Sequence, residues 1–283
     1  MDEQNMDILD RIHASYYQLS AAERKAADYV IGHHDQVQFM SITQLADECG
    51  VAEATVSRFC RSLKLKGFNA FKIELAKHSV SSGAARLQSQ SPDTLGGRTQ
   101  EVGRLAVEAV NNTIEMVDAK QFLRAVELFE KAPHVMCIGS GGSMIMASAF
   151  ANLFSMADPK FYAVSDSHTQ ISSAATMGQE DIIVLFSYSG ATTSGVQVLE
   201  LARSRGIATV LITRYPKSPA AKLADVVLQC GANENPLQSG SVAARIAQMY
   251  LLDVLFSEYS RRNLARTRYN RARIAEALAD KHL

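Results

Sequence analysis

The chain has 283 residues, more than a typical single domain, so two domains are the natural expectation. Its 29 basic and 29 acidic residues balance, and the composition is that of an ordinary soluble protein. No apolar run approaches the length of a membrane span, and the acidic N-terminus is unlike a signal peptide. We therefore expect a cytoplasmic protein that does not contact the membrane.

The zero net charge conceals an uneven distribution along the chain. Between Met1 and Glu53 there are ten carboxylates and only three basic residues. Between Arg58 and Lys77 six basic residues accompany one carboxylate. A compact basic patch of this kind is compatible with a polyanionic partner, although the whole chain is neutral.

The four cysteines are scattered among apolar neighbours and form no Cys-x-x-Cys pair. This pattern favours reduced core thiols over zinc ligands or disulfides. We expect no metal site and no cofactor.

The N-terminal segment has the periodicity of four helices. Ser20 and Glu23 have the spacing of a capping box that starts the second of them, and Gly50 ends the third. The predicted helices are Ile8 to Tyr17, Ser20 to Ile31, Ile42 to Cys49 and Val51 to Leu63.

The third and fourth helices have the features of a helix-turn-helix. They are short, a glycine joins them, and the second is basic on its outer face, as entry into the major groove of DNA requires. An ordinary helical hairpin with a solvated basic face is the alternative. The candidate DNA-binding residues are Thr55, Ser57 and Arg58, near the start of the fourth helix and suited to base edges, and Arg61, Lys64 and Lys66, suited to phosphates.

Periodicity fails between Ser79 and Gln100, where serine, glycine and proline are frequent. We expect a linker over residues 79–100, between a helix-turn-helix domain over residues 1–78 and a second domain over residues 101–283. Helical patterns resume over Val102 to Val117 and Phe122 to Phe129.

The second domain alternates strand and helix patterns. This alternation predicts a doubly wound α/β domain with a mostly parallel sheet. The predicted strands are Val135 to Ile138, Phe161 to Val164, Ile182 to Phe186, Ala208 to Ile212 and Val226 to Leu228, and helices are expected over Met144 to Phe154, through Ile171 and Ala175, over Val196 to Ala202, near Ala220 to Leu223 and over Ser241 to Phe256.

A loop rich in hydroxyls follows the third predicted strand. Ser187, Ser189, Gly190 and Thr192 lie where a strand turns into a helix, so free backbone N–H groups and the positive end of a helix dipole meet there. We expect an anion site. The alternative is that the hydroxyls only cap the helix and that Gly190 only turns the chain.

The glycine-rich loop after the first strand falls at the same sheet edge and is expected to line the same pocket. Met144 occupies the sixth position of its Gly-x-Gly-x-x-Gly pattern, which argues against a dinucleotide site. Ser143 offers a hydroxyl that either caps a helix or contacts the ligand.

Both halves resemble one family, the RpiR-type transcriptional regulators, in which a helix-turn-helix domain precedes a sugar isomerase (SIS) domain. In the first half the resemblance rests on Ser41-Ile-Thr-Gln-Leu-Ala46, Glu53-Ala-Thr-Val56, Arg58-Phe-Cys60 and Leu65-Lys-Gly-Phe68. In the second half it rests on Gly139-x-Gly-x-Ser143, Asp166-Ser-His168, Asp181-Ile-Ile, Ser187-Tyr-Ser-Gly190-x-Thr192 and Arg245-Ile-Ala-Gln248.

The resemblance implies a regulator of sugar metabolism that binds two-fold symmetric double-stranded DNA as a homodimer or homotetramer. It also implies that Ser187, Ser189 and Thr192 hold the phosphate of a phosphosugar effector, with Ser143 contacting the same ligand. Three positions depart from the family pattern. They are Ala52, where a capping serine is usual, Ser194, where an acidic residue is usual, and Gln238, near which an arginine is usual.

Two other functions compete with this hypothesis. A phosphosugar aldose–ketose isomerase needs a proton-transferring residue, for which Glu234 and His168 are the nearest candidates. A sugar-phosphate-binding adaptor would use its first domain to contact protein. The sequence offers no convincing base for isomerisation, and it adds a helix-turn-helix to the second domain. We therefore expect a regulator and not an enzyme.

Overall fold

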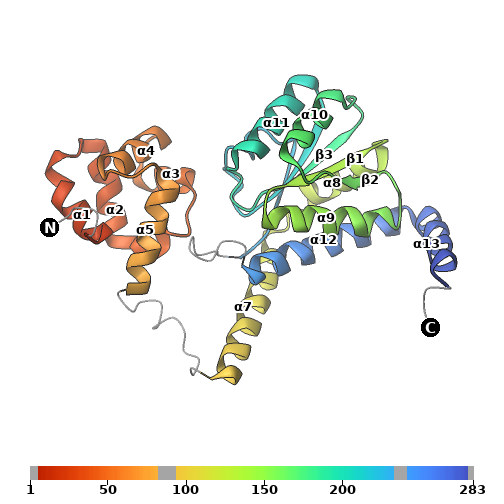
Figure 1. Ribbon diagram of the computed structural model, residues 1–283, viewed down its shortest axis with the longest axis horizontal. Coiled ribbons are helices and arrows are strands. Elements are labelled where there is room, and N and C mark those ends of the chain that lie inside the picture. Colours follow the sequence, from red (N-terminus) through yellow and green to blue (C-terminus); the bar gives the residue numbers. More distant parts are fainter. Residues whose placement is uncertain (1–5, 82–93, 233–240, 280–283) are drawn as a thin grey trace. The chain divides into compact units, whose positions relative to one another are not determined.

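The computed structural model describes residues 6–81, 94–232 and 241–279 (Figure 1). The chain forms two compact units, one containing the described residues up to Leu105 and the other those from Ala106 to Ala232 and from Val242 onward. No helix in the described part of the chain is long and apolar enough to cross a membrane.

The first unit is entirely helical. Its core is built around Phe59 and Phe71, which pack edge to face and are fully buried. Its elements are α1 (Ile8–Ser15), η2 (Tyr16–Gln18), α2 (Ala21–Val37), α3 (Ile42–Cys49), α4 (Glu53–Ser62) and α5 (Phe68–Ser81).

Local capping sets where these helices begin and end. The capping box predicted for Ser20 and Glu23 is confirmed, and Ser41 forms a second one with Gln44. Gly50 ends α3 in the left-handed conformation, with φ of 61°, as predicted. Ala52 precedes α4 and provides no side-chain cap.

The second unit alternates helices and strands. The helix α7 (Leu95–Met116) enters it and continues into α8 (Ala119–Lys131). The remaining elements are β1 (Val135–Gly139), α9 (Gly142–Ser155), β2 (Phe161–Ala163), α10 (Ser167–Thr176), β3 (Ile182–Phe186), α11 (Thr193–Arg205), β4 (Ala208–Thr213), β5 (Val226–Gln229), α12 (Val242–Arg262) and α13 (Leu264–Leu278).

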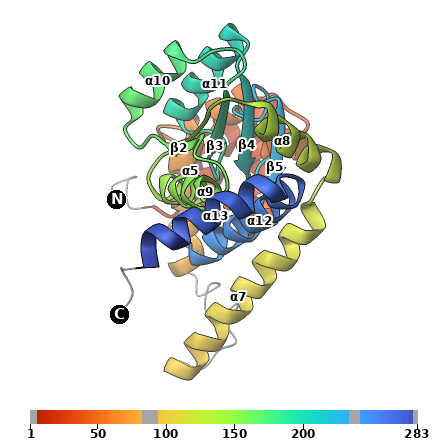
Figure 2. The same cartoon turned by 90° about the vertical axis from the view of Figure 1, so that its right-hand side faces the viewer.

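The five strands form a parallel sheet in the order β2-β1-β3-β4-β5. Alternate side chains of each strand enter opposite cores: Cys137 packs with α8, α9 and α12, whereas Ile138 packs with α10 and α11. Figures 1 and 2 show these two helical layers on either side of the sheet. The predicted doubly wound α/β domain is confirmed.

Two predicted features differ from the structure. Residues 220–223 form turns, because the Ala220 N–H donates to the Gly190 carbonyl and the Ala221 N–H to the Ser218 hydroxyl. Within the predicted linker, α5 continues to Ser81 and α7 begins at Leu95, where the Thr94 hydroxyl accepts the Gly97 N–H. The rest of that stretch, residues 82–93, lies outside the described residues.

Candidate functional site

The helix-turn-helix is formed by α3 and α4 around Gly50. A side-chain hydrogen bond joins the two helices: the Thr43 hydroxyl donates to Glu53 Oε1 at 2.8 Å. Thr43 is buried, and Glu53 is the first residue of α4. Ala52 cannot cap α4. The Thr43 side chain, which comes from α3, holds the first residue of α4 in its place.

Five of the six candidate DNA-binding residues are accessible. Ser57 is half-buried, and Arg58, Arg61, Lys64 and Lys66 are exposed. These four basic side chains provide the charge needed for phosphate contacts.

Thr55, which we expected to be suited to base edges, is buried instead. It is 5% exposed, and its hydroxyl accepts a hydrogen bond from Arg58 Nη2 at 3.0 Å. The inner stripe of α4 turns Thr55 into the core, so its contribution is to orient Arg58.

The turn after α4 holds Lys64 in an unusual conformation. Lys64 has φ of 61°, in the left-handed region that non-glycine residues rarely adopt. Its N–H bonds to the Arg61 carbonyl, and the Arg11 guanidinium donates to the Leu63 carbonyl. Sequence reasoning missed Arg11, because nothing in its spacing links α1 to this turn.

A carboxylate from α2 also reaches α4. Glu23 Oε1 accepts the Ser62 hydroxyl at 3.1 Å, and Glu23 is 9% exposed. The Ser20 hydroxyl bond lowers the pKa of Glu23 below its ordinary value, with smaller contributions from Ser62 and Arg58. The ionised carboxylate therefore joins the second helix to the basic one.

In the second unit, the two loops predicted to bind an anion lie side by side. They follow β1 and β3, which are adjacent strands on either side of the point where the strand order reverses. Ligands in doubly wound sheets bind at the carboxyl ends of strands at such a point. The hydroxyl of Ser140, in the loop after β1, lies 3.2 Å from the hydroxyl of Ser194, in the first turn of α11.

The loop after β3 is a tight turn built by its own residues. Ser187 is buried, and its hydroxyl accepts the Gly190 N–H at 3.1 Å. Gly190 has φ of 59°, and a Cβ there would lie 2.0 Å from Ser218 Oγ. These two residues shape the turn.

Ser189 and Thr192 are the exposed hydroxyls of this loop. Ser189 Oγ accepts the Ala191 N–H at 3.2 Å and keeps its own proton to donate. Thr192 precedes α11 without a side-chain cap, so the side chains of this loop leave the first N–H groups of the helix available to an anion.

The loop after β1 brings helix and strand into contact. A Cβ on Gly139 would lie 2.8 Å from the Ser143 carbonyl carbon, so only glycine fits there. Gly141, with φ of 54°, precedes α9 and offers no cap, and Ser143 is half-buried in the first turn of α9.

Gln170 is a further residue of this region that sequence reasoning missed. It is 1% exposed, and its Nε2 donates to the carbonyls of Gly139 at 3.0 Å and Val164 at 2.9 Å. It therefore holds the end of β1 against the end of β2. A single glutamine in a helical pattern carries no signal of this role.

The two candidate bases are placed differently. His168 is exposed in the first turn of α10, which Asp166 caps. Hydrogen bonds from Thr169 lower the pKa of Asp166. Glu234 and Gln238 lie outside the described residues.

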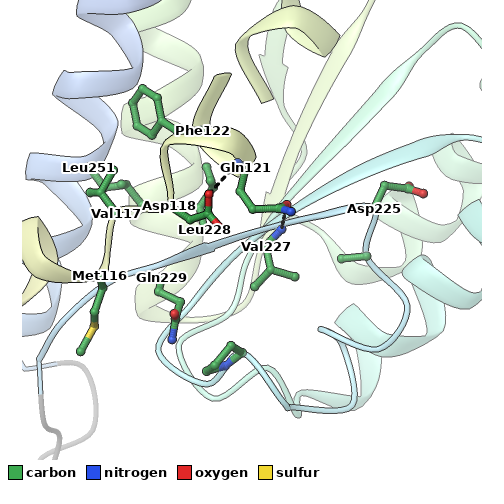
Figure 3. A pocket seen from close by; sticks show the side chains of 12 residues that line it. Met116, Val117, Asp118, Gln121, Phe122, Asp225, Val227, Leu228, Gln229 and Leu251 are labelled. Carbon is green, nitrogen blue, oxygen red and sulfur yellow. Dashed lines mark hydrogen bonds between the residues drawn. The ribbon is translucent and has the colours of Figure 1, made fainter. Parts of the chain in front are cut away.

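A cavity of about 350 Å³ elsewhere in the second unit contains none of the predicted ligand residues. It lies where α7, α8 and β5 meet, and Figure 3 shows Gln121 reaching Val227, whose N–H it accepts at 3.4 Å. No cluster of three or more metal-ligating side chains occurs within the described ranges.

A helix-turn-helix in the first unit and a doubly wound α/β fold in the second are an arrangement typical of transcriptional regulators, and comparison with known proteins gives the family. A model of the rpiR-family helix-turn-helix domain matches residues 6–82, and a SIS-domain model matches residues 128–258. The chain belongs to the RpiR family of HTH-type transcriptional regulators.

Relatives in several bacteria match over most of their length. An uncharacterised HTH-type regulator of Caldanaerobacter subterraneus is 31% identical over 252 residues, 88% of this chain and 89% of the relative. HexR of Escherichia coli is 28% identical over 277 residues, 97% of this chain and 95% of HexR. The structure of Vibrio vulnificus NanR complexed with ManNAc-6P has a TM-score of 0.87 at 27% identity, covering 97% and 99% of the two chains.

Proposed function

We propose that this transcriptional regulator senses a phosphosugar through its SIS domain and thereby controls genes of sugar metabolism. The uncapped start of α11 beside Ser189 and Thr192 is the observation that carries the proposal. A phosphate accepts hydrogen bonds from backbone N–H groups and hydroxyls at a helix start. The phosphosugar bound to NanR supports the same ligand class.

On DNA, Arg58, Arg61, Lys64 and Lys66 contact the duplex, with Ser57 at base edges and Thr55 holding Arg58. Two helix-turn-helix domains, supplied by a homodimer or by a homotetramer, would occupy the two half-sites of a two-fold symmetric DNA site. We place the DNA-binding domain in residues 1–78 and the sensing domain in residues 101–283.

Binding to DNA from upstream of the gene itself tests the first half of the proposal. The protein should bind that duplex at least tenfold more tightly than a shuffled duplex of equal length at moderate salt. Equal affinity for both duplexes contradicts it.

Isomerisation of a phosphosugar is the rival function. The protein should leave glucose 6-phosphate and fructose 6-phosphate unconverted. Conversion that disappears in Glu234→Gln or His168→Asn would reverse our assignment.

A further inference from the structure

Tyr188 joins the loop after β3 to a segment far from it in the sequence. It lies between Ser187 and Ser189, and its main-chain carbonyl accepts the Arg214 N–H at 3.1 Å. Its hydroxyl donates to the carbonyl of Ala232, a buried residue that follows β5. The side chain next to the proposed phosphate contacts thus reaches the segment after β5.

The Tyr188 ring packs into a small apolar cluster formed by α7, the segment after β5 and the start of α12. Its other members are Ala243 and the buried residues Ala109, Cys230, Ala232, Ala244 and Ala247. Among the described residues, Tyr188 is therefore the one large side chain of this cluster. A shift of its ring would remove contacts from all three elements, because protein interiors are close-packed.

The segment after β5 is in turn held against α7 without free space. The Gly231 N–H donates to the Thr113 hydroxyl oxygen at 2.9 Å, and Thr113 is fully buried in α7. A Cβ on Gly231 would lie 2.6 Å from the Asn112 carbonyl carbon. The two backbones are so close that Gly231 cannot move toward α7 unless the helix moves with it.

The helix α7 carries the connection between the two units. It begins at Leu95 among the residues of the first unit and ends at Met116 in the second. A displacement of one half of a helix is passed to the other half, because a helix is a rigid element. Contacts therefore lead from the loop after β3, through Tyr188 and Gly231, to the helix that continues the chain from the DNA-binding domain.

We propose that Tyr188 couples effector binding to DNA binding. Its hydroxyl bond to Ala232 is formed in one state of the loop after β3 and broken in the other, and α7 is displaced between the two states. A phosphosugar that favours one state then changes the affinity for DNA. The inference rests on the proposed phosphosugar site and adds to it the route by which that site regulates DNA binding. Tyr188 acts here as a positioning residue for α7.

Tyr188→Phe tests this inference because it removes the hydroxyl and keeps the ring. Glucose 6-phosphate and 6-phosphogluconate are the probes, used with the full chain. One of them should change the wild-type dissociation constant for the upstream duplex by about fivefold or more. In Tyr188→Phe this response should fall below about twofold, while the affinity for the same probe and the affinity for DNA without a probe stay within about threefold of the wild type. Calorimetry measures the first affinity and fluorescence anisotropy the second.

Two further variants make the test specific. Thr113→Val removes the acceptor of the Gly231 N–H and keeps the shape of the side chain, so it should also reduce the response below about twofold. Tyr259→Phe removes another tyrosine hydroxyl of the second unit, which donates to Asp158 Oδ2 at 3.1 Å, and should keep the full response.

The outcomes separate this inference from the proposed function. A Tyr188→Phe or Thr113→Val variant that keeps the full response, or a Tyr259→Phe variant that loses it, overturns the inference alone. A Tyr188→Phe variant whose affinity for the probe or for DNA alone changes more than about threefold has a structural defect, which overturns the inference too. A wild type that binds neither probe, or whose DNA binding neither probe alters, contradicts the proposed function and the inference with it.

Discussion

The Gly190 Cα and the Ser218 side chain are in such close contact that a single added methyl group would overlap Ser218. A Cβ on Gly190 would lie 2.0 Å from Ser218 Oγ and 2.5 Å from Ser218 Cβ. Ser218 is fully buried and cannot move aside. The turn that carries Ser189 and Thr192 is thus clamped onto the segment after β4.

Gly190→Ala should therefore destabilise the second unit strongly. The overlap and the positive φ together should cost about 3 kcal/mol, as overpacking and backbone strain do. Gly206→Ala is the matched control, because Gly206 also has a positive φ, of 71°, but a Cβ there meets only the flexible Gln179 side chain, at 3.5 Å. It should cost about 1 kcal/mol. Urea unfolding measures the free energy of unfolding of both variants, and equal losses would contradict the close contact between Gly190 and Ser218.

Ser189→Ala should weaken phosphosugar binding without affecting the fold. The exposed hydroxyl is lost, so the thermal stabilisation by glucose 6-phosphate should fall, corresponding to about tenfold weaker binding. Ser204→Ala, at the far end of α11, is the control and should bind normally. Unphosphorylated glucose should stabilise neither protein.

Arg58→Ala should reduce DNA affinity about tenfold and flatten its dependence on salt, because a phosphate or base contact is lost. Thr55→Val should produce a smaller loss, since it removes only the acceptor that orients Arg58. Lys131→Ala, a basic residue at the end of α8, is the control. Fluorescence anisotropy across a salt series measures all three. An unchanged salt slope in Arg58→Ala would exclude Arg58 from the interface.

Glu23→Gln should destabilise the protein at pH 7 by about 1 kcal/mol, the net value of a typical hydrogen bond. The pKa of Glu23 is lowered in the folded state. Its contribution is therefore complete above the unfolded pKa and is lost as the pH falls through the lower folded value. Urea unfolding of both proteins from pH 7 to pH 3 should show converging stabilities. A constant difference would exclude ionisation as the cause.

Short-range patterns predicted most of the fold. The capping box at Ser20 and the turn at Gly50 depend on neighbouring residues, and so does the apolar strand before Ser187. The predicted linker over residues 79–100 was too long at both ends. At its C-terminal end Thr94 caps α7, and the glycines near the start of that helix had argued against a helix there.

Contacts between distant segments could not be predicted in the same way. Thr43 reaches Glu53 and Gln170 reaches Gly139 only after the helices and strands have packed. Thr55 was misplaced because helical periodicity puts it at the edge of the inner stripe, where a small rotation decides between core and surface.

The most direct test of the central claim measures whether a phosphosugar changes affinity for DNA. Anisotropy titrations on the upstream duplex should be run with glucose 6-phosphate, 6-phosphogluconate and unphosphorylated glucose, using the wild type and Ser189→Ala. We predict that a phosphorylated ligand changes the wild-type dissociation constant by at least fivefold, a coupling of about 1 kcal/mol, and that Ser189→Ala loses this response. Specific DNA binding that no phosphosugar alters, or a response that Ser189→Ala retains in full, would contradict the account.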